Sequence, residues 1–234
     1  MKLYTLPNLM TCGNLLCGCA GIVSAFRGDL LLAGMLIGVA GLLDFGDGFV
    51  ARLLKQNSEI GKQLDSLADV VTFGTLPALI IFQLIERTTD DIPHLPSYLA
   101  FVLAVFSALR LAKFNVDTRQ SDSFIGVPTP ANAFLVASLP FILRHNPALE
   151  PFIVNQTNLL IYTFLMSFLL VAELPLFALK FKSFGWNGNE LPFSFLGISV
   201  VLLAFLHFVA VPLVIALYIL LSLVFRKKPS PLAK

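Results

Sequence analysis

The chain has 234 residues, of which 57% are hydrophobic and 13% are charged, and its formal net charge is +2. A soluble globular domain carries roughly 25% charged residues, so this composition excludes a soluble fold and indicates an integral membrane protein. The small net charge gives no sign of a nucleic-acid partner.

Apolar stretches long enough to cross a bilayer recur along the whole chain. A transmembrane helix needs about 20 mainly apolar residues to cross about 30 Å of hydrocarbon. The stretches that meet this requirement are 7–26, 28–46, 66–85, 96–114, 125–143, 158–176, 190–206 and 208–225. The last two form one run that is too long for a single crossing, and His207 and Pro212 mark the expected break. We therefore expect an all-α polytopic membrane protein with about eight transmembrane helices in a single domain, 1–234; one long kinked final helix would give seven.

The distribution of basic residues indicates the orientation. If the chain crosses eight times, only Arg27, Arg87 and Arg144 of the 16 lysines and arginines lie on the side opposite to the N-terminus. Cytoplasmic loops carry an excess of basic residues. We therefore expect both termini to be cytoplasmic, in a cell inner membrane.

The first stretch carries polar side chains in its cytoplasmic half. Asn8, Thr11 and Asn14 lie three residues apart, at the depth expected for the aspartates at the end of the second stretch. Such side chains either contact a ligand or bond to neighbouring helices, and the sequence leaves both interpretations open.

Four aspartates stand at the facing ends of the second and third stretches, within 42–71, LLDFGDGFVARLLKQNSEIGKQLDSLADVV. At 100° per residue, Asp44 and Asp47 share one helix face, and Asp65 and Asp69 share another. The polar turn between them is short, so the two helices run antiparallel and the four carboxylates converge near the cytoplasmic interface. The small residues that leave room for a ligand beside them are Gly48, Ala51 and Gly61.

Four carboxylates this close repel one another strongly in a low dielectric, and a divalent cation resolves the conflict. Ligands that are all oxygen suit Mg²⁺, Mn²⁺ or Ca²⁺ rather than zinc. Carboxylate-held Mg²⁺ typically binds together with substrate phosphates, and Arg52 is placed to contact a phosphate. The cluster therefore indicates phosphoryl chemistry at the membrane surface. The alternatives are solvated loop charges and a carboxylate-based ion transport path, which clustering at one interface fits poorly.

Two later stretches also carry candidate binding residues near their cytoplasmic ends. Arg110 and Lys113 are placed to meet a phosphate or an amino-acid carboxylate, unless they only anchor the helix by positive charge. Pro128, with Pro130, either lines a substrate site or only shapes the start of its helix.

The aspartate pattern resembles the signature of the CDP-alcohol phosphotransferases. All eight fixed positions are present: Asp44-x₂-Asp47-Gly48-x₂-Ala51-Arg52-x₈-Gly61-x₃-Asp65-x₃-Asp69. The resemblance implies a six-helix catalytic core, usually dimeric, that transfers a phosphatidyl group from a CDP-linked lipid to an alcohol and releases CMP. It also implies a divalent metal, Mg²⁺ or Mn²⁺ with Ca²⁺ as an inhibitory occupant, and it implies these roles: Asp44, Asp47 and Asp65 as metal ligands, Asp69 as a further ligand and general base, and Gly48, Ala51, Arg52 and Gly61 as the nucleotide and phosphate pocket.

Within this family the chain most resembles the phosphatidylserine synthases. The stretches that carry this likeness are ADVVTFGTLPA after the signature, RLAKFNV at 110–116, which includes Asn115, and GVPTPANA at 126–133. Val70 follows the last aspartate, where relatives that use glycerol phosphate or inositol tend to carry Lys or Arg. The resemblance covers about 5–185 and implies CDP-diacylglycerol and L-serine as substrates, with the last two spans, 190–225, as accessory helices. Another acceptor alcohol and an archaeal ether-lipid donor are the alternatives. The further substrate contacts expected are Asn8, Thr11, Arg110, Lys113, Asn115 and Pro128.

Overall fold

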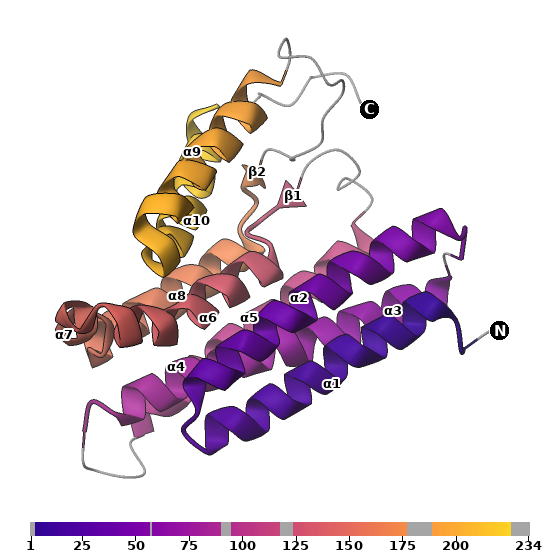
Figure 1. Ribbon diagram of the computed structural model, residues 1–234. Helices are drawn as coiled ribbons and strands as arrows, with labels where there is room; N and C mark the ends of the chain where they lie inside the picture. The colour runs from indigo at the N-terminus through magenta and orange to yellow at the C-terminus, as the bar shows by residue number, and fades with distance from the viewer. Residues whose placement is uncertain (1–2, 57, 90–94, 118–123, 177–188, 226–234) are drawn as a thin grey trace.

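The computed structural model describes residues 3–56, 58–89, 95–117, 124–176 and 189–225 (Figure 1). In the first half of the chain the elements are α1 (Leu6–Phe26), α2 (Leu30–Leu53), α3 (Glu59–Asp69), the π-helix η1 (Val70–Thr75), α4 (Leu76–Glu86), the 3-10 helix η2 (Leu95–Phe101) and α5 (Val102–Val116). In the second half they are β1 (Phe124–Ile125), α6 (Thr129–His145), η4 (Pro147–Leu149), α7 (Glu150–Ile153), α8 (Gln156–Val171), β2 (Pro175–Leu176), α9 (Glu190–Leu206), η5 (His207–Val209) and α10 (Ala210–Val224).

Each predicted apolar stretch corresponds to a helical segment of the described chain. The segments are, in order, α1, α2, α3–η1–α4, η2–α5, α6, α8, α9 and α10. By length and composition, five helical runs of the described residues are suited to cross a membrane, or six if the bent pair α7 and α8 counts as one span. In that count α9 and α10 form a single run of 35 residues. The fold is all-α and polytopic as predicted, and the number of eight crossings stays a prediction.

Short capping interactions set the beginnings of the first three helices. Thr5, Asp29 and Ser58 each place a side-chain oxygen on a backbone N–H three residues later, at the starts of α1, α2 and α3. Such a cap satisfies one of the free N–H groups at a helix start. The cap at Ser58 lets α3 begin before the apolar stretch 66–85, so the helix extends past the membrane-buried part and carries Asp65 inward.

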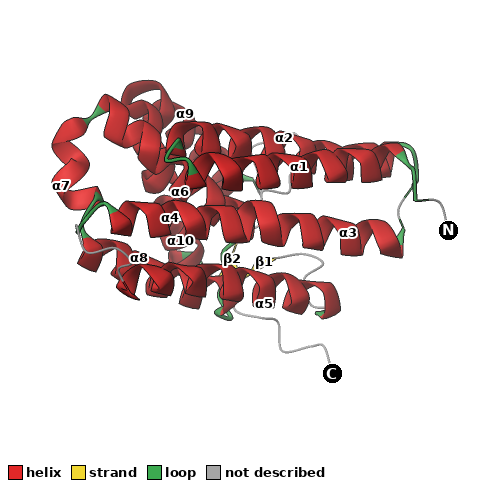
Figure 2. Ribbon diagram, turned by 90° about the horizontal axis from the view of Figure 1, so that it is seen from below, coloured by secondary structure: helices red, strands yellow, loops and turns green. Residues whose placement is uncertain are grey.

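The helices alternate in direction, so that one end of the bundle collects the start of α1, the end of α2 and the start of α3 (Figure 2). The end of α5 lies there too, because Lys62 Nζ of α3 donates to the Asn115 carbonyl at 3.0 Å. At the opposite end, Arg87 Nη2 donates to the Gly28 carbonyl at 3.5 Å. The chain ends, 1–2 and 226–234, for which the sequence predicts a cytoplasmic location, lie outside the described residues.

The core lies where α1, α2, α4, α6 and α8 meet around η1. Its buried side chains include Ala25, Ala33, Ile37, Phe73, Ile80, Ile81, Ala133, Val136 and Leu159. Because lipid tails are as apolar as these side chains, close packing holds the helices together more than removal from water does. Gly18 shows how close the packing is, since a Cβ there would lie 2.2 Å from Thr72 Oγ1 of η1.

The start of α6 and the end of α8 are joined by a minimal sheet. β1 and β2 pair antiparallel, with Ile125 opposite Pro175. Gly126, at φ +77°, passes so close to α8 that a Cβ would lie 2.3 Å from the Leu170 carbonyl oxygen. Beyond this sheet, α9 and α10 lie side by side as a hairpin against α6 (Figure 1). The break that the sequence predicts at His207 is present, and this residue has φ +50°.

Candidate active site

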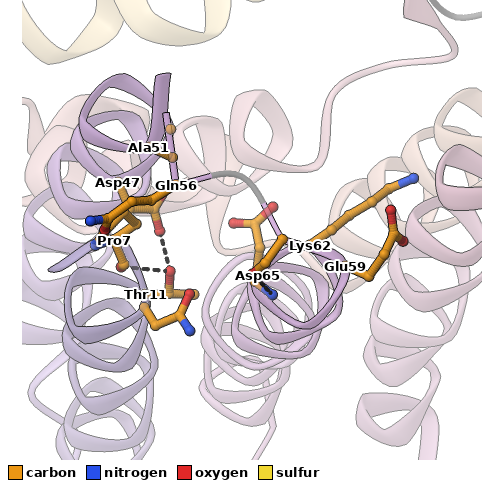
Figure 3. Close-up of a pocket in the computed structure, with 12 residues that line it drawn as sticks. Pro7, Thr11, Asp47, Ala51, Gln56, Glu59, Lys62 and Asp65 are labelled. Atoms are coloured by element: carbon orange, nitrogen blue, oxygen red, sulfur yellow. Dashed lines mark hydrogen bonds between the residues drawn. The ribbon is translucent and has the colours of Figure 1, made fainter. Parts of the chain in front are cut away.

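A pocket of about 540 Å³ opens at the end of the bundle where α1 begins, α2 ends and α3 begins (Figure 3). Its lining residues are Pro7, Asn8 and Thr11 from α1, Asp47, Gly48 and Ala51 from α2, Gln56 and Ser58 from the turn, and Glu59, Gly61, Lys62 and Asp65 from α3. Seven of the residues predicted for the site are among them, so the structure brings together the α1, α2 and α3 parts of the predicted set.

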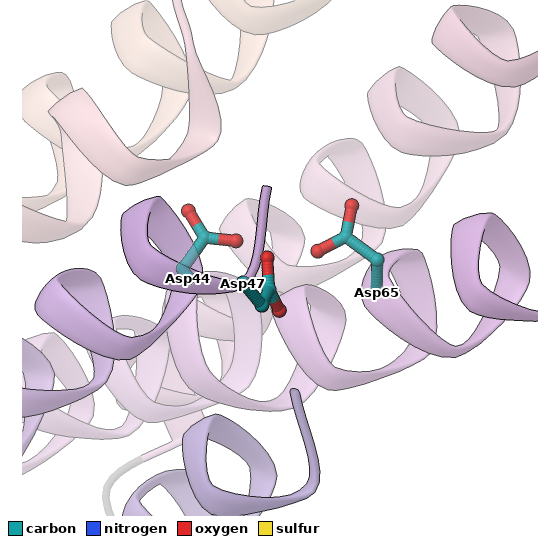
Figure 4. A group of neighbouring side chains, drawn as sticks. All are labelled: Asp44, Asp47 and Asp65. Carbon is teal, nitrogen blue, oxygen red and sulfur yellow. The ribbon is translucent and has the colours of Figure 1, made fainter. Parts of the chain in front are cut away.

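Three carboxylates converge beside this pocket. Asp44 and Asp47 project from α2 and Asp65 from α3, and Figure 4 shows the three side chains turned toward one another. Each offers an oxygen, and these oxygens all lie within 4.8 Å of one another. The helical spacing that puts Asp44 and Asp47 on one face therefore holds, and the predicted antiparallel arrangement of the two helices is confirmed.

The charge of this trio, Asp44, Asp47 and Asp65, has no cationic partner among the residues that the structure describes. Asp47 is buried, with 7% of its surface exposed, and the other two are half-buried. Carboxylates held together out of water need a counter-charge. A donor set made only of carboxylate oxygens fits a hard divalent cation.

Thr11 fixes the position of one member of the trio. Its Oγ1 lies 2.5 Å from Asp47 Oδ2 and 3.1 Å from the Pro7 carbonyl oxygen. A hydroxyl has a single proton to donate, so one of these oxygens receives it at a time. The contact ties α1 to α2 at the level of the carboxylates. It supports both interpretations of the polar face of α1, because Thr11 bonds to a neighbouring helix and lines the pocket.

Asp69 lies one turn deeper than Asp65 and outside the trio. It is buried, and its Oδ1 accepts a hydrogen bond from Asn14 Nδ2 at 3.1 Å. Asn14 is fully buried, and its own backbone carbonyl accepts from Thr72 Oγ1 at 3.2 Å. Asn14 is one of the three polar side chains that the sequence singles out on α1, and it bonds to a neighbouring helix, which is one of the two interpretations left open.

Arg52 and Lys62 are two cations at the pocket end of the bundle. Arg52 is exposed in the last turn of α2 and does not line the pocket, but its Nη1 lies 3.6 Å from where a Cβ on Gly48 would stand. Lys62 lines the pocket and was not predicted. The signal for it is its position three residues before Asp65, which puts both on one face of α3.

Four further candidates lie outside the pocket lining. Asn115 Nδ2 donates to Ser66 Oγ at 2.8 Å and so links α5 to α3. Lys113 forms an ion pair with Glu173 at 3.0 Å, which fits the anchoring interpretation. Pro128 is the N-cap residue of α6. Arg110 is buried, and its Nη1 donates to Thr129 Oγ1 at 3.0 Å.

Comparisons with known proteins cover most of the chain. Residues 4–176 match the family model described as CDP-alcohol phosphatidyltransferase. A relative from Helicobacter pylori strain J99 is 41% identical over 136 residues, which are 57% of this chain and 56% of the relative. A relative from Bacillus subtilis is 34% identical over 144 residues, 62% of this chain and 78% of the relative. One from Saccharomyces cerevisiae is 40% identical over 110 residues, 43% of this chain and 38% of the relative.

All three relatives are named CDP-diacylglycerol–serine O-phosphatidyltransferase. The alignment spans about half the length of the Helicobacter relative, at 56%. The family match runs from α1 to the end of β2, and it stops before α9. Since the matched residues make up most of the chain and include every carboxylate of the pocket, the chain belongs to the CDP-alcohol phosphatidyltransferase family.

Proposed function

We propose that this protein transfers a phosphatidyl group from CDP-diacylglycerol to the hydroxyl of L-serine, forming phosphatidylserine and releasing CMP. The observation that carries the proposal is the carboxylate trio beside a pocket, on helices within the family match, in a chain whose relatives are named CDP-diacylglycerol–serine O-phosphatidyltransferase. A cluster of acids next to a polar pocket at a membrane surface is suited to a substrate that carries a diphosphate.

The trio would hold a divalent cation, Mg²⁺ or Mn²⁺, with Ca²⁺ as an inhibitory occupant. Asp44, Asp47 and Asp65 supply oxygen donors within 4.8 Å of one another, and Asp69 is close enough to act electrostatically on all three. When bound, such a cation neutralises charge on the donor diphosphate and on the transferred phosphoryl group. Thr11 keeps Asp47 in place for this role.

The nucleotide end of the donor would lie along the small residues of the pocket wall. Gly48, Ala51 and Gly61 line the pocket and allow a ligand to approach the helix backbone. Gly61 is close to Asn8, since a Cβ there would lie 3.1 Å from Asn8 Oδ1. Arg52, beside Gly48, would reach over the rim to hold a phosphate with two N–H donors at once.

Asp69 would take the proton of the acceptor hydroxyl. In a direct transfer, the serine oxygen forms a bond to the phosphorus that bears diacylglycerol, and the bond from that phosphorus to the CMP oxygen breaks. The hydroxyl proton passes to Asp69, whose carboxylate is oriented by Asn14. Ser58, a hydroxyl of the pocket, accepts the Gly61 N–H at 3.1 Å as the cap of α3, and we assign it no covalent role.

We place the pocket on the cytoplasmic side of a cell inner membrane and expect a homodimer. Lys55 and Lys62 lie at the pocket end of the bundle, whereas Arg27 and Arg87 lie at the other. An excess of basic residues marks cytoplasmic loops. On that side, a lipid donor enters from the bilayer and serine from the water phase.

CMP release by the purified full-length protein tests the proposed function. CDP-diacylglycerol and Mn²⁺ would be mixed with L-serine, or in parallel with glycerol 3-phosphate, inositol or other alcohols, and an ether-lipid donor would be compared. We expect release that depends on serine and on the metal, is lost on chelation and returns with Mn²⁺ or Mg²⁺. If CMP is released with a different alcohol and not with serine, that alcohol is the acceptor. Absence of release with every acceptor would contradict the transferase and favour carboxylate-based ion transport.

A further inference from the structure

Asn14 of α1 carries a buried hydrogen-bond acceptor that the fold leaves unused. Its side chain is fully buried, and its Nδ2 donates to Asp69 Oδ1 of α3 at 3.1 Å. The other polar atom of this side chain, Oδ1, is buried and has no hydrogen-bond partner among the described residues. A buried polar atom without a partner is rare and costly in a folded protein, so this oxygen points to a ligand that donates a hydrogen bond.

The bonds around the amide fix its orientation and leave Oδ1 without a donor from the protein. An ionised carboxylate only accepts hydrogen bonds, so the nitrogen of the amide has to face Asp69. The proton of the Thr72 hydroxyl goes to the backbone carbonyl of Asn14, at 3.2 Å. The proton of the Thr11 hydroxyl, one turn earlier on α1, goes either to Asp47 Oδ2 or to the backbone of α1. Neither hydroxyl can therefore supply the missing donor while it keeps these bonds.

The charge near Asn14 selects the kind of donor that the ligand brings. The carboxylate of Asp69 is bonded to the same amide, and Asp65 lies one turn away along α3. A cation held by the trio leaves the charge of Asp69 in direct contact with the amide. An anionic ligand group would be repelled here, whereas a positively charged donor is attracted by Asp69 and can bond to the amide oxygen. An ammonium group meets both conditions.

We propose that Asn14 Oδ1 accepts a hydrogen bond from an ammonium group of the acceptor, beside the hydroxyl that reacts at Asp69, so that Asn14 selects amino alcohols. This inference rests on the proposed function and names the part of the acceptor that the site recognises. Because Nδ2 and Oδ1 belong to one planar amide, a group that contacts Oδ1 lies beside a group that contacts Asp69. In serine the ammonium and the hydroxyl are on neighbouring carbons, which matches this arrangement. Glycerol 3-phosphate and inositol have no ammonium group and would leave the oxygen unpaired.

The preference for L-serine over 3-hydroxypropionate tests this role, because the two compounds differ only by the ammonium group. With the full-length protein, CDP-diacylglycerol and Mn²⁺, the KM for serine is compared with the inhibition constant of 3-hydroxypropionate in the serine reaction. We expect the wild-type protein to prefer serine by about 100-fold or more. Asn14→Ala should lower this preference by about 10- to 100-fold, the size expected for one hydrogen bond to a charged group. Equal affinity of the wild-type protein for the two compounds would overturn the inference without any variant.

A role in orienting Asp69 alone predicts a different result. In that case Asn14→Ala lowers kcat and leaves the preference for serine as it is in the wild-type protein, which would overturn the inference. The matched control is Asn132→Ala, which removes an equally buried amide whose Oδ1 accepts from Tyr162 Oη at 2.6 Å and whose Nδ2 is unpaired among the described residues. This control should keep the preference for serine. Loss of the preference in Asn132→Ala and not in Asn14→Ala would assign the contact to α6 and contradict the role of Asn14.

CMP release by the wild-type protein decides the proposed function separately. If serine supports release and the preference does not depend on Asn14, the transferase stands and this inference fails. If another amino alcohol is the acceptor, serine is replaced in the proposed function, and the same comparison with the analogue of that alcohol that lacks the ammonium group supports or overturns the role of Asn14. An acceptor without an ammonium group would overturn the inference.

Discussion

The reactive part of the site consists of carboxylates that lie close together and largely out of water, where their charge is poorly solvated. Asp47 and Asp69 are buried, and Asp44 and Asp65 are half-buried. Water solvates carboxylates poorly at such positions, so helix packing holds these charges together against their mutual repulsion. A ligand that brings positive charge to this point therefore interacts with all four acids together.

Removing one carboxylate of the trio separates its role in the reaction from its role in the fold. We expect Asp44→Asn or Asp65→Asn to reduce metal-dependent CMP release by about 100-fold or more, comparable to the loss of one electrostatic group in other active sites. The folded protein should be at least as stable, because the amide relieves repulsion between carboxylates. Release rates across a Mn²⁺ titration and thermal unfolding without metal measure the two effects.

Asp29→Asn is the matched control for these variants. Asp29 caps α2 at the opposite end of the bundle, and asparagine caps a helix as well as aspartate does. Its activity and stability should match those of the wild-type protein. Transfer at the wild-type rate in both trio variants would contradict the metal assignment.

We expect Asp69 to have a different role in the reaction from that of the trio. If it takes the proton of the acceptor, Asp69→Asn keeps metal-dependent binding of CDP-diacylglycerol and lowers the rate of transfer by about 10²–10⁴-fold. Asp44→Asn should weaken donor binding as well. Donor affinity and single-turnover rates measured on both variants make the comparison. Equal loss of donor binding would show that Asp69 is mainly a metal ligand and that the base lies elsewhere.

At the scale of elements, the π-helix η1 connects the carboxylates to the core. It comes directly after Asp69, and Thr72 in it donates to the Asn14 carbonyl while Gly18 makes room for Thr72. The wider turn of a π-helix rotates the face of the helix after it relative to the face of the helix before it. The side chain of Asp69 can thus face Asn14 of α1 while Leu76 and the rest of α4 face the core.

Two glycines with positive φ offer a comparison of backbone strain with steric overlap. Gly28 has φ +82°, and a Cβ there would have no atom within 4 Å. Gly126 has φ +77°, and a Cβ there would lie 2.3 Å from the Leu170 carbonyl oxygen. We expect Gly28→Ala to lower the free energy of unfolding by about 1 kcal/mol, the cost of a left-handed residue.

Gly126→Ala should cost about 3 kcal/mol or more, because backbone atoms must also move apart. Thermal unfolding of both variants in the same detergent measures the difference. Equal destabilisation would mean that the strand pair β1–β2 shifts freely and does not hold α6 against α8.

The regular elements were predictable because their signal is local. Apolar runs of about 20 residues indicate the helices, and the spacing of Asp44, Asp47 and Asp65 indicates that they meet. Features that depend on contacts between helices were not predictable. The π-helix η1 after Asp69 packs on α1 through a hydrogen bond from the Thr72 hydroxyl to the Asn14 carbonyl. Lys62 lines the pocket because α3 begins before its apolar stretch.

At the scale of the whole molecule, the two ends of the bundle should face different compartments. A single cysteine replacing Lys55, in a protein whose three native cysteines are changed to serine, should react with a membrane-impermeant reagent only after the cells are permeabilised. A cysteine replacing Arg144, at the end of α6, should react in intact cells. Both positions precede α9 and test the orientation of the first spans independently of how α9 and α10 cross. Labelling of both from the same side would overturn the proposed topology.

The bundle also divides into a long-helix and a short-helix half. α1 and α2 have 21 and 24 residues and the run from α3 to α4 has 28, whereas α6, α8, α9 and α10 have 15 to 17. At 1.5 Å per residue the first group spans about 32–42 Å and the second about 23–26 Å, against a hydrocarbon thickness of about 30 Å. A bilayer adapts to short helices by thinning locally. If α9 and α10 each cross the membrane, as the sequence predicts, we expect the bilayer beside them to be thinner, with lipid headgroups drawn toward the midplane.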